Sequence, residues 1–438
     1  MKIAVPKERR AREARVAASP ETVKKLVGLG ATVTVEAGAG AGASMLDAAY
    51  QAAGAAIAAD IAPALAEADA VLKVQRPSAE EIAQIKPGAM LCCIMAPHAD
   101  RATLDAAAAR GLAVFGMEFI PRITRAQSMD VLSSQANLAG YRAVIEAAQH
   151  YTRSFPMFMT AAGTVQAAKC FVIGAGVAGL QAIATARRLG AVVSATDVRK
   201  AAGEQVESLG AKYIFIDLPE GEGGGGYARA LTPDEQKKQA ELVANHIKTQ
   251  DIVITTALIP GRPAPRLITQ AMVETMKPGS VIVDLAAEAG GNCELTKADE
   301  IVRHGNVSIL GFTDLPSRIA VDASSLYARN ILNFLQPLVD KETKSLKPNW
   351  DDEIVKGTLL ARDGKVVHPA LAPPAAAEAP VAAAPPPAPA ADREVSIPTA
   401  PPPTPPDAAA AEPPRPKGEP VPPPDDATVV PPRRPSES

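Results

Sequence analysis

The sequence predicts an α/β fold with two Rossmann-like, doubly wound domains, each built on a mostly parallel sheet, with a cleft between them. Short apolar runs alternate with helical patterns through both halves of the chain, as expected for parallel sheets covered by helices. Near the middle, a glycine-rich turn joins one apolar run to a helix. The 438 residues suffice for two such domains and one further segment.

The glycine-rich turn is Gly174-Ala175-Gly176-Val177-Ala178-Gly179, and it follows the apolar run 170–173. In this pattern Gly174 permits a tight turn, Gly176 lets a pyrophosphate approach the backbone, and Gly179 lets the helix pack against the strand. The N-terminus of the helix that follows attracts phosphate charge. Such a motif alone is weak, because many are only glycine-rich turns, but here a strand and a helix flank it in the required order.

A second apolar run, residues 191–195, ends shortly before Asp197, Val198 and Arg199. An acid about 20 residues beyond the first glycine accepts hydrogen bonds from the adenosine ribose of a dinucleotide. Asp197 would also repel a 2′-phosphate, which favours NAD(H) over NADP(H), although the neighbouring Arg199 weakens that preference. The sequence thus predicts an NAD(H)-binding domain around the motif.

Composition argues against several other functions. A net charge of −3 gives no sign of nucleic-acid binding. The four cysteines and five histidines show no spacing typical of a metal site, so we expect no metal. No apolar run is long enough to cross a bilayer, and the first residues lack the apolar core of a signal peptide, so we expect a soluble, cytoplasmic protein.

The first part of the chain alternates between strand and helix patterns. Strands are expected at residues 2–6, 32–36, 71–74, 89–95 and 113–115. Helices are expected at residues 20–28, 48–53, 61–67, 79–85 and 103–110, with Ser19 as the N-cap of the first. A long helical pattern at 131–150 is typical of a helix that bridges two domains.

In the second half, strands are expected at residues 170–173, 191–195, 214–216, 252–255, 281–283 and 307–310. A long helix is expected at 322–338, and its length and position indicate that the chain returns to the first domain. We therefore expect a discontinuous first domain, residues 1–135 and 322–370, and an NAD-binding Rossmann domain, residues 136–321.

Two segments interrupt this pattern. Around residues 219–231, four consecutive glycines precede Tyr227, and such a run cannot hold a strand or helix. It is either a surface insertion or a mobile loop that closes over a ligand. From about residue 371 alanine and proline dominate, with most of the 41 prolines, so residues 371–438 are expected to be a disordered tail or linker.

Longer motifs support a family resemblance. The most specific is Arg122-Ile123-Thr124-Arg125-Ala126-Gln127-Ser128-Met129-Asp130. The others are residues 5–8, 13–16, 132–137, 226–228, 255–261 and 284–292, together with the glycine fingerprint. Over roughly residues 1–370 the chain resembles the NAD-binding soluble part (alpha-1) of proton-translocating NAD(P) transhydrogenase alpha subunits, in the alanine dehydrogenase/transhydrogenase family.

The resemblance implies roles for individual residues. In that family Arg122 and Asp130 hold the nicotinamide carboxamide and Ser133 assists. Gln127 reaches toward NADP(H) on a separate subunit, and Tyr227 closes over bound NAD(H). Further nucleotide contacts are implied for Thr256, Ala257, Leu258 and Glu288. Direct hydride transfer between two nicotinamides needs no acid or base, but it needs both rings held with the reacting carbons roughly 3–3.5 Å apart.

Alanine dehydrogenase is the main alternative, because it shares this fold and differs in substrate. It needs a cation for the pyruvate carboxylate and a protonatable group near the carbonyl. Its K-V-K-E-P pattern has Gln75 in place of the second lysine here, Ala96 stands where its histidine would be, and Glu288 replaces an aspartate. Arg15 is retained, but alone it cannot support amino-acid chemistry. A module that binds NAD(H) without transferring hydride is the third possibility.

The resemblance also implies the setting of the chain. Hydride transfer would be reversible, direct, and coupled to proton translocation by membrane-embedded subunits on other chains, with NADP(H) held by a beta subunit. The chain would form a homodimer attached to the cytoplasmic side of the inner membrane through those partners. Its Ala/Pro-rich tail would act as a tether or be dispensable.

Overall fold

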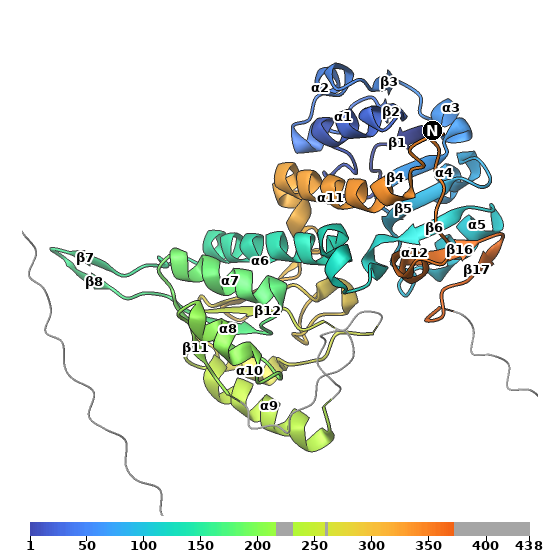
Figure 1. Cartoon of the computed structure of the whole chain (residues 1–438). Helices are drawn as coiled ribbons and strands as arrows, with labels where there is room; N and C mark the ends of the chain where they lie inside the picture. The colour runs from blue at the N-terminus through green and yellow to red at the C-terminus, as the bar shows by residue number, and fades with distance from the viewer. Residues whose placement is uncertain (216–230, 259–261, 372–438) are drawn as a thin grey trace, which may run out of the picture. The chain divides into compact units, whose positions relative to one another are not determined.

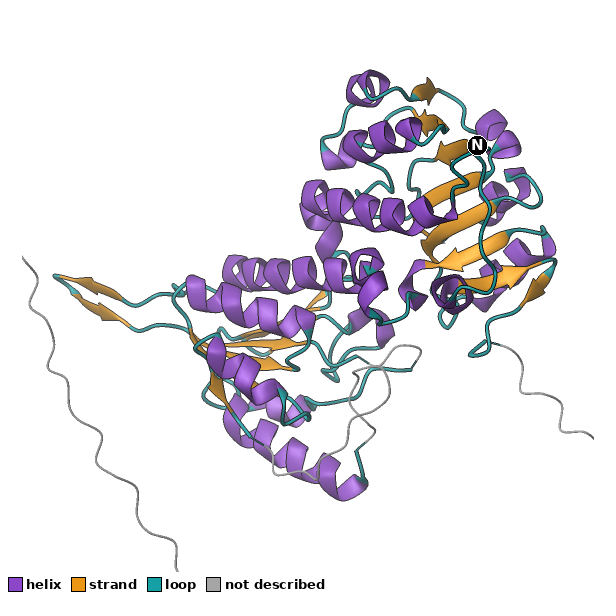
Figure 2. Cartoon of the chain, in the orientation of Figure 1, coloured by secondary structure: helices purple, strands orange, loops and turns teal. Residues whose placement is uncertain are grey.

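The computed structural model describes residues 1–215, 231–258 and 262–371, which contain two large sheets with helices beside them (Figures 1 and 2). Most of the predicted loop with Tyr227, residues 259–261, and the tail from residue 372 lie outside the described residues. Within the described ranges, no helix combines the length and the apolar composition needed to span a bilayer.

The first sheet has eight strands in the order β17-β16-β6-β5-β4-β1-β2-β3. Strands β1 to β6 are parallel, whereas β16 and β17 add an antiparallel edge from far along the chain. The strands are β1 (Lys2–Val5), β2 (Thr32–Glu36), β3 (Ala56–Ala58), β4 (Ala70–Gln75), β5 (Met90–Ile94), β6 (Ala113–Gly116), β16 (Leu359–Arg362) and β17 (Lys365–Val366). The strand order reverses between β1 and β4, which makes this a topological switch point.

Helices cover both faces of the first sheet. Alternate residues of β1 enter different buried clusters, Ile3 and Val5 one cluster and Ala4 another, because successive strand residues point to opposite faces. The helices are α1 (Pro20–Gly28), α2 (Asp47–Ala52), α3 (Ala62–Glu67), α4 (Ala79–Gln84), α5 (Arg101–Ala109), α11 (Ala320–Leu335) and α12 (Glu353–Thr358). The predicted cap of α1 is confirmed, since Ser19 Oγ accepts the Thr22 N–H at 3.2 Å.

The second sheet has seven strands in the order β11-β10-β9-β12-β13-β15-β14, and every neighbouring pair except β14–β15 is parallel. The strands are β9 (Lys169–Ile173), β10 (Val192–Thr196), β11 (Lys212–Tyr213), β12 (Ile252–Thr255), β13 (Val281–Asp284), β14 (Ile301–His304) and β15 (Val307–Leu310). The helices are α7 (Val177–Arg188), α8 (Ala202–Ser208), α9 (Pro233–Ile247) and α10 (Gln270–Glu274). Its switch point lies between β9 and β12.

One long helix connects the two halves. Helix α6 (Val131–His150) has the bounds predicted from its sequence pattern. Val131, at its beginning, belongs to a buried cluster of the first sheet, whereas Ala143 and Val144 belong to the cluster of the second. The helix is therefore anchored in both cores.

The structure corrects several sequence predictions. The strand expected at 214–216 is wrong at residues 214 and 215, which form no strand, and residue 216 lies outside the described residues. The strand β11 is instead Lys212–Tyr213, which pairs with β10 at Ser194 and Ala195. The helix expected at 322–338 ends at Leu335 and continues as a 3₁₀ turn, Gln336–Leu338, because Pro337 has no N–H for an α-helical bond. The hairpin β7 (Phe158–Thr160) and β8 (Gly163–Val165), and the strands β3, β14, β16 and β17, were not expected.

Candidate nucleotide site

The turn between β9 and α7 has room for a ligand at one glycine and none at another. Gly174 has φ +99°, a conformation that favours glycine. A Cβ atom on Gly176 would meet no atom within 4 Å, whereas one on Gly179 would lie 1.9 Å from the carbonyl oxygen of Gly174. Within the described residues, no side chain caps α7. Open space beside uncapped N–H groups suits the phosphates of a dinucleotide.

Asp197 follows β10 and faces the same turn. Its Oδ2 accepts the N–H of Ala175 at 2.7 Å, which ties the acid to the glycine motif. Arg199 donates from its backbone N–H at 2.8 Å and its Nε at 2.9 Å to Oδ1, and from Nη2 at 3.0 Å to Oδ2. The carboxylate that would bind a ribose is thus held in place by the arginine that the sequence placed beside it.

The loop after β12 is fixed by a buried asparagine. Asn292, which is fully buried, accepts the N–H of Ala257 at 3.0 Å and donates to the Ala257 carbonyl at 2.8 Å. Thr256 donates to the Gly174 carbonyl at 3.1 Å, so this loop also contacts the glycine turn. Sequence reasoning gave Asn292 no role. Its only signal was its position after the two glycines that follow β13.

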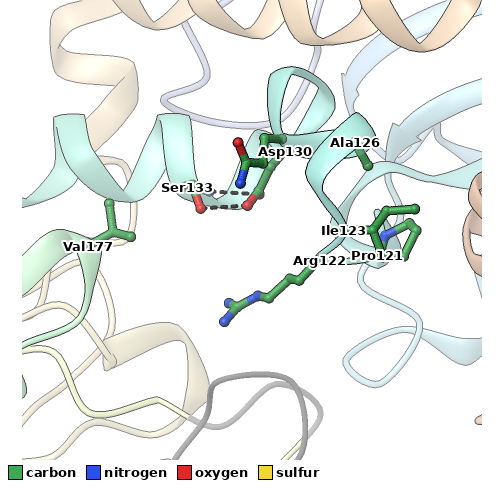
Figure 3. Close-up of a pocket in the computed structure, with 8 residues that line it drawn as sticks. Pro121, Arg122, Ile123, Ala126, Asp130, Ser133 and Val177 are labelled. Carbon is green, nitrogen blue, oxygen red and sulfur yellow. Dashed lines mark hydrogen bonds between the residues drawn. The ribbon is translucent and has the colours of Figure 1, made fainter. Parts of the chain in front are cut away.

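A pocket of about 270 Å³ brings together residues predicted from separate motifs. Figure 3 shows Arg122, Asp130, Ser133 and Val177 around it. The residues that line it are Pro121, Arg122, Ile123, Ala126, Gln127, Asp130, Ser133 and Val177. The three residues expected to hold the nicotinamide carboxamide and Gln127, expected to reach toward NADP(H), therefore line one pocket with the first residue of α7. Asp197, Arg199, Thr256, Ala257, Leu258 and Glu288 do not line this pocket.

Local structure orients the polar groups of this pocket. A 3₁₀ segment, Thr124–Met129, carries Gln127, and Asp130 is the N-cap of α6. Asp130 Oδ1 accepts the Ser133 N–H at 2.9 Å, and Oδ2 accepts the Ser133 hydroxyl at 2.5 Å (Figure 3). Because a carboxylate has about four acceptor positions, Asp130 can still accept an N–H from a ligand.

Glu288 lies at a link between the two halves of the chain. It belongs to a 3₁₀ turn, Ala287–Ala289, after β13. Its Oε1 accepts Arg10 Nη2 at 3.2 Å, and Arg10 also donates to Gln75 at 3.2 Å. The side chain is 59% exposed, so the structure leaves it accessible but pairs it with a cation of the first half.

The arginine retained from the alanine dehydrogenase pattern is already engaged. Arg15 donates to Glu13 at 2.5 and 2.7 Å and to Gln135 at 2.8 Å. Gln75 also donates to Glu13, at 3.0 Å. Burial opposes ionisation of Glu13, but the hydrogen bonds and charge of Arg15 outweigh it and lower the pKa to about 2. A carboxylate of the chain itself thus takes the cation that a pyruvate carboxylate would need.

Ala96 follows β5, stands where the alanine dehydrogenase pattern has a histidine, and has no group that exchanges a proton. Ala96 has φ +47°, and its N–H donates to Glu118 at 2.6 Å. Burial raises the pKa of Glu118. Glu118 also accepts the N–H of Met95 at 3.0 Å, so its hydrogen bonds go to the backbone around Ala96.

Fold and site together define a two-domain α/β protein with a Rossmann-type dinucleotide-binding domain. The chain belongs to the alanine dehydrogenase/PNT family: the N-terminal domain of that family matches residues 4–139, and its C-terminal domain matches residues 143–369. The family resemblance predicted from the sequence motifs is confirmed.

Relatives and solved structures agree with this assignment. The first part of the NAD(P) transhydrogenase alpha subunit of Rhodospirillum rubrum is 58% identical over 379 residues, which cover 85% of this chain and 99% of that protein. The transhydrogenase structure from Sinorhizobium meliloti is 55% identical with a TM-score of 0.77, covering 84% of this chain and 100% of that one. Alanine dehydrogenase of Halomonas elongata is 31% identical over 380 residues, covering 85% and 96%. The predicted two-domain α/β fold is likewise confirmed.

Proposed function

We propose that this chain is the NAD(H)-binding subunit of a proton-translocating NAD(P) transhydrogenase. It would hold NAD(H) while hydride passes directly to or from NADP(H) on a partner subunit. The observation that carries this proposal is the pocket in which Arg122, Gln127, Asp130 and Ser133 meet the beginning of α7. The high identity to proteins named as transhydrogenase alpha subunits supports it.

The residues of the pocket would fix a nicotinamide ring by its carboxamide. The bound nucleotide supplies the carbon that gives or takes the hydride. Asp130 would accept the carboxamide N–H, held in orientation by Ser133, and Arg122 would donate to the carboxamide oxygen. None of these groups has to exchange a proton, since their task is orientation. Gln127, exposed at the pocket, would contact the nucleotide of the partner.

The Rossmann domain would hold the rest of the dinucleotide. The open space at Gly176 and the N–H groups of α7 would receive the pyrophosphate. Asp197 would accept hydrogen bonds from the ribose hydroxyls, which would replace some of the hydrogen bonds that it accepts from Arg199. The loop at Ala257, fixed by Asn292, would lie along the nucleotide.

The engaged Arg15 favours transhydrogenation over alanine oxidation. A pyruvate carboxylate would have to displace Glu13, whose pKa is lowered to about 2, from its buried ion pair with Arg15. Gln75 supplies no positive charge and Ala96 no proton for amino-acid chemistry. We therefore assign no amino-acid substrate to this chain.

The proposal includes the organisation of the assembly. Residues 1–135 and 322–370 would form one domain and residues 136–321 the other. The chain would act as a homodimer with an NADP-binding beta subunit and membrane-embedded subunits, at the cytoplasmic side of the membrane.

The test combines the purified chain with an NADP-binding domain of a transhydrogenase. Reduction of an NAD analogue by NADPH is followed in the mixture and in each component alone, with alanine plus NAD as a parallel assay. We expect turnover only in the mixture and none with alanine. Turnover with alanine by this chain alone would contradict the proposal. NADH binding without any turnover would favour a nucleotide-binding module without transfer activity.

Gln127→Asn tests the role of the partner-facing side chain. Shortening the side chain by one methylene keeps its amide but withdraws it from the partner nucleotide. We expect NADH affinity within about threefold of the unaltered chain and hydride transfer slower by about tenfold or more, since misplacement of about 1 Å has large effects on rate. Calorimetry and the mixed assay measure the two. A collapse of NADH affinity would instead place Gln127 in the NAD pocket itself.

A further inference from the structure

Helices α6 and α7 meet at a glycine that leaves no room for a side chain. Gly140 is buried in the middle of α6. A Cβ atom on it would lie 2.1 Å from the carbonyl oxygen of Ala178 and 2.8 Å from the carbonyl carbon. Ala178 is the second residue of α7. The obstacle is therefore the backbone of the first turn of α7, which no change of rotamer moves aside.

Local preference does not account for this glycine. Alanine is the better helix former in the middle of a helix, so Gly140 weakens α6 on its own. The close approach of the two helices supplies the reason. The first turn of α7 also packs closely on the glycine turn, because a Cβ atom on Gly179 would lie 1.9 Å from the carbonyl oxygen of Gly174. That turn is thus in close contact with both the glycine turn and α6.

The two helices carry opposite ends of the proposed nucleotide site. Ser133 and the N-cap Asp130 line the pocket from α6, and Val177 lines it from the beginning of α7 (Figure 3). At a rise of about 1.5 Å per residue, Ser133 lies roughly 10 Å along α6 from Gly140. A change of helix spacing at Gly140 would be carried along the helix to Ser133 and Asp130.

We propose that Gly140 is a positioning residue, whose contact with Ala178 sets the separation between the phosphate end and the nicotinamide end of the site. The inference rests on the proposed function, which assigns these two ends to α7 and to the pocket at Asp130. A methyl group at position 140 forces the helices apart by about 1 Å, and a misplacement of this size slows reactions about 100-fold. The phosphate end keeps its own contacts with the glycine turn.

The experiment compares the full chain with its Gly140→Ala variant, using NADH and ADP-ribose as probes. ADP-ribose lacks the nicotinamide, so it reports the phosphate and adenosine end alone. We expect ADP-ribose affinity within about threefold of the unaltered chain, NADH affinity about tenfold lower, and hydride transfer to an NADP-binding domain about 100-fold slower. Gly28→Ala is the matched control, since a Cβ atom there meets nothing within 4 Å.

Val144→Ala controls for loss of packing in the same helix. Val144 lies one turn beyond Gly140 and is fully buried, so its truncation lowers stability without pushing α6 away from α7. The unfolding midpoint should fall while the ratio of NADH to ADP-ribose affinity stays constant. If Gly140→Ala is too unstable to assay, the same ratio is measured for it and for the unaltered chain in trimethylamine N-oxide, an osmolyte that favours the folded state.

The outcomes separate the positioning role from the proposed function. A parallel loss of NADH and ADP-ribose affinity would overturn the positioning role, because it would mean general damage to the domain. Unchanged affinities with unchanged hydride transfer would overturn it as well. Failure of the unaltered chain to bind NADH would instead overturn the proposed function.

Discussion

The two sheets share the order of their first five strands but differ in what lies at their switch points. In the first sheet, the carboxylate of Glu8 fills the point between β1 and β4, where it accepts the N–H groups of Val74 at 2.6 Å and Gln75 at 3.4 Å. In the second sheet, Gly174 and Gly176 stand at the corresponding point after β9, with open space at Gly176. One switch point is occupied by the chain itself, and the other is available to a ligand.

The charges around Glu8 explain why the first switch point stays filled. Lys73 lies 3.0 Å from Glu81 and 3.5 Å from Glu8, and all three side chains are buried. Tyr327 of α11 donates to the Lys73 carbonyl at 2.8 Å and covers the group. A doubly wound fold thus does not by itself define a nucleotide site; the residues at its switch point decide.

The largest expected effect comes from removing the buried cation beside the filled switch point. Lys73→Met keeps the length of the side chain but removes the charge that two buried carboxylates share. We expect a loss of about 3–5 kcal/mol in the free energy of unfolding, because removal of one partner leaves buried charge uncompensated. Urea unfolding of the full chain at neutral pH measures it.

Lys2→Met is the matched control, since Lys2 pairs with Glu67 at 2.6 Å on the surface. Exposed ion pairs contribute little to stability, so the Lys2→Met variant should have the same free energy of unfolding as the unaltered chain. Equal behaviour of the two variants would mean that the buried charges do not stabilise the first domain.

Sequence patterns predicted the elements better than the contacts between them. The bounds of α6 and the Ser19 cap follow from helical periodicity and from residue preferences at helix ends. The hairpin β7–β8 and the edge strands β16 and β17 were missed, because short or exposed strands carry no apolar alternation.

In the candidate site, the residues of one short motif could be predicted from the sequence, whereas the contacts between distant segments could not. Arg122, Gln127, Asp130 and Ser133 lie within one short stretch, so a motif could point to them before the pocket was seen. The bonds from Asn292 to Ala257, and the contact of Gly140 with Ala178, join residues far apart in the sequence. No local pattern encodes such approaches.

The next expected effect is that the free energy of unfolding depends on pH through Glu8 at the filled switch point. Burial raises the pKa of Glu8 from its ordinary value of 4.5 to about 7, although Lys73 and the backbone bonds oppose the rise. The unfolded chain ionises Glu8 at the lower pH. Its contribution to stability is therefore complete below about pH 4.5 and falls as the pH rises to 7, by roughly 3 kcal/mol.

Glu8→Gln tests this assignment, because the amide oxygen can still accept the Val74 N–H but cannot ionise. Free energies of unfolding are measured for both proteins between pH 4.5 and 7.5. We expect the unaltered chain to lose stability relative to the variant across this range. Parallel curves would show that Glu8 does not titrate there.

The smallest expected change is in the binding free energy of NADH at the open switch point, and it should come without a change in the free energy of unfolding. Gly176 has φ −77°, which alanine adopts readily, and a Cβ atom there meets no protein atom within 4 Å. The Gly176→Ala variant should therefore unfold at the same urea concentration as the unaltered chain. The same methyl would occupy the space where a pyrophosphate approaches the backbone, so we expect NADH affinity to fall by at least about 100-fold, or about 2.8 kcal/mol. Calorimetry with NADH, beside urea unfolding, separates the two quantities. Retained affinity would mean that the nucleotide does not bind over this turn, and that the open space at the second switch point has another use.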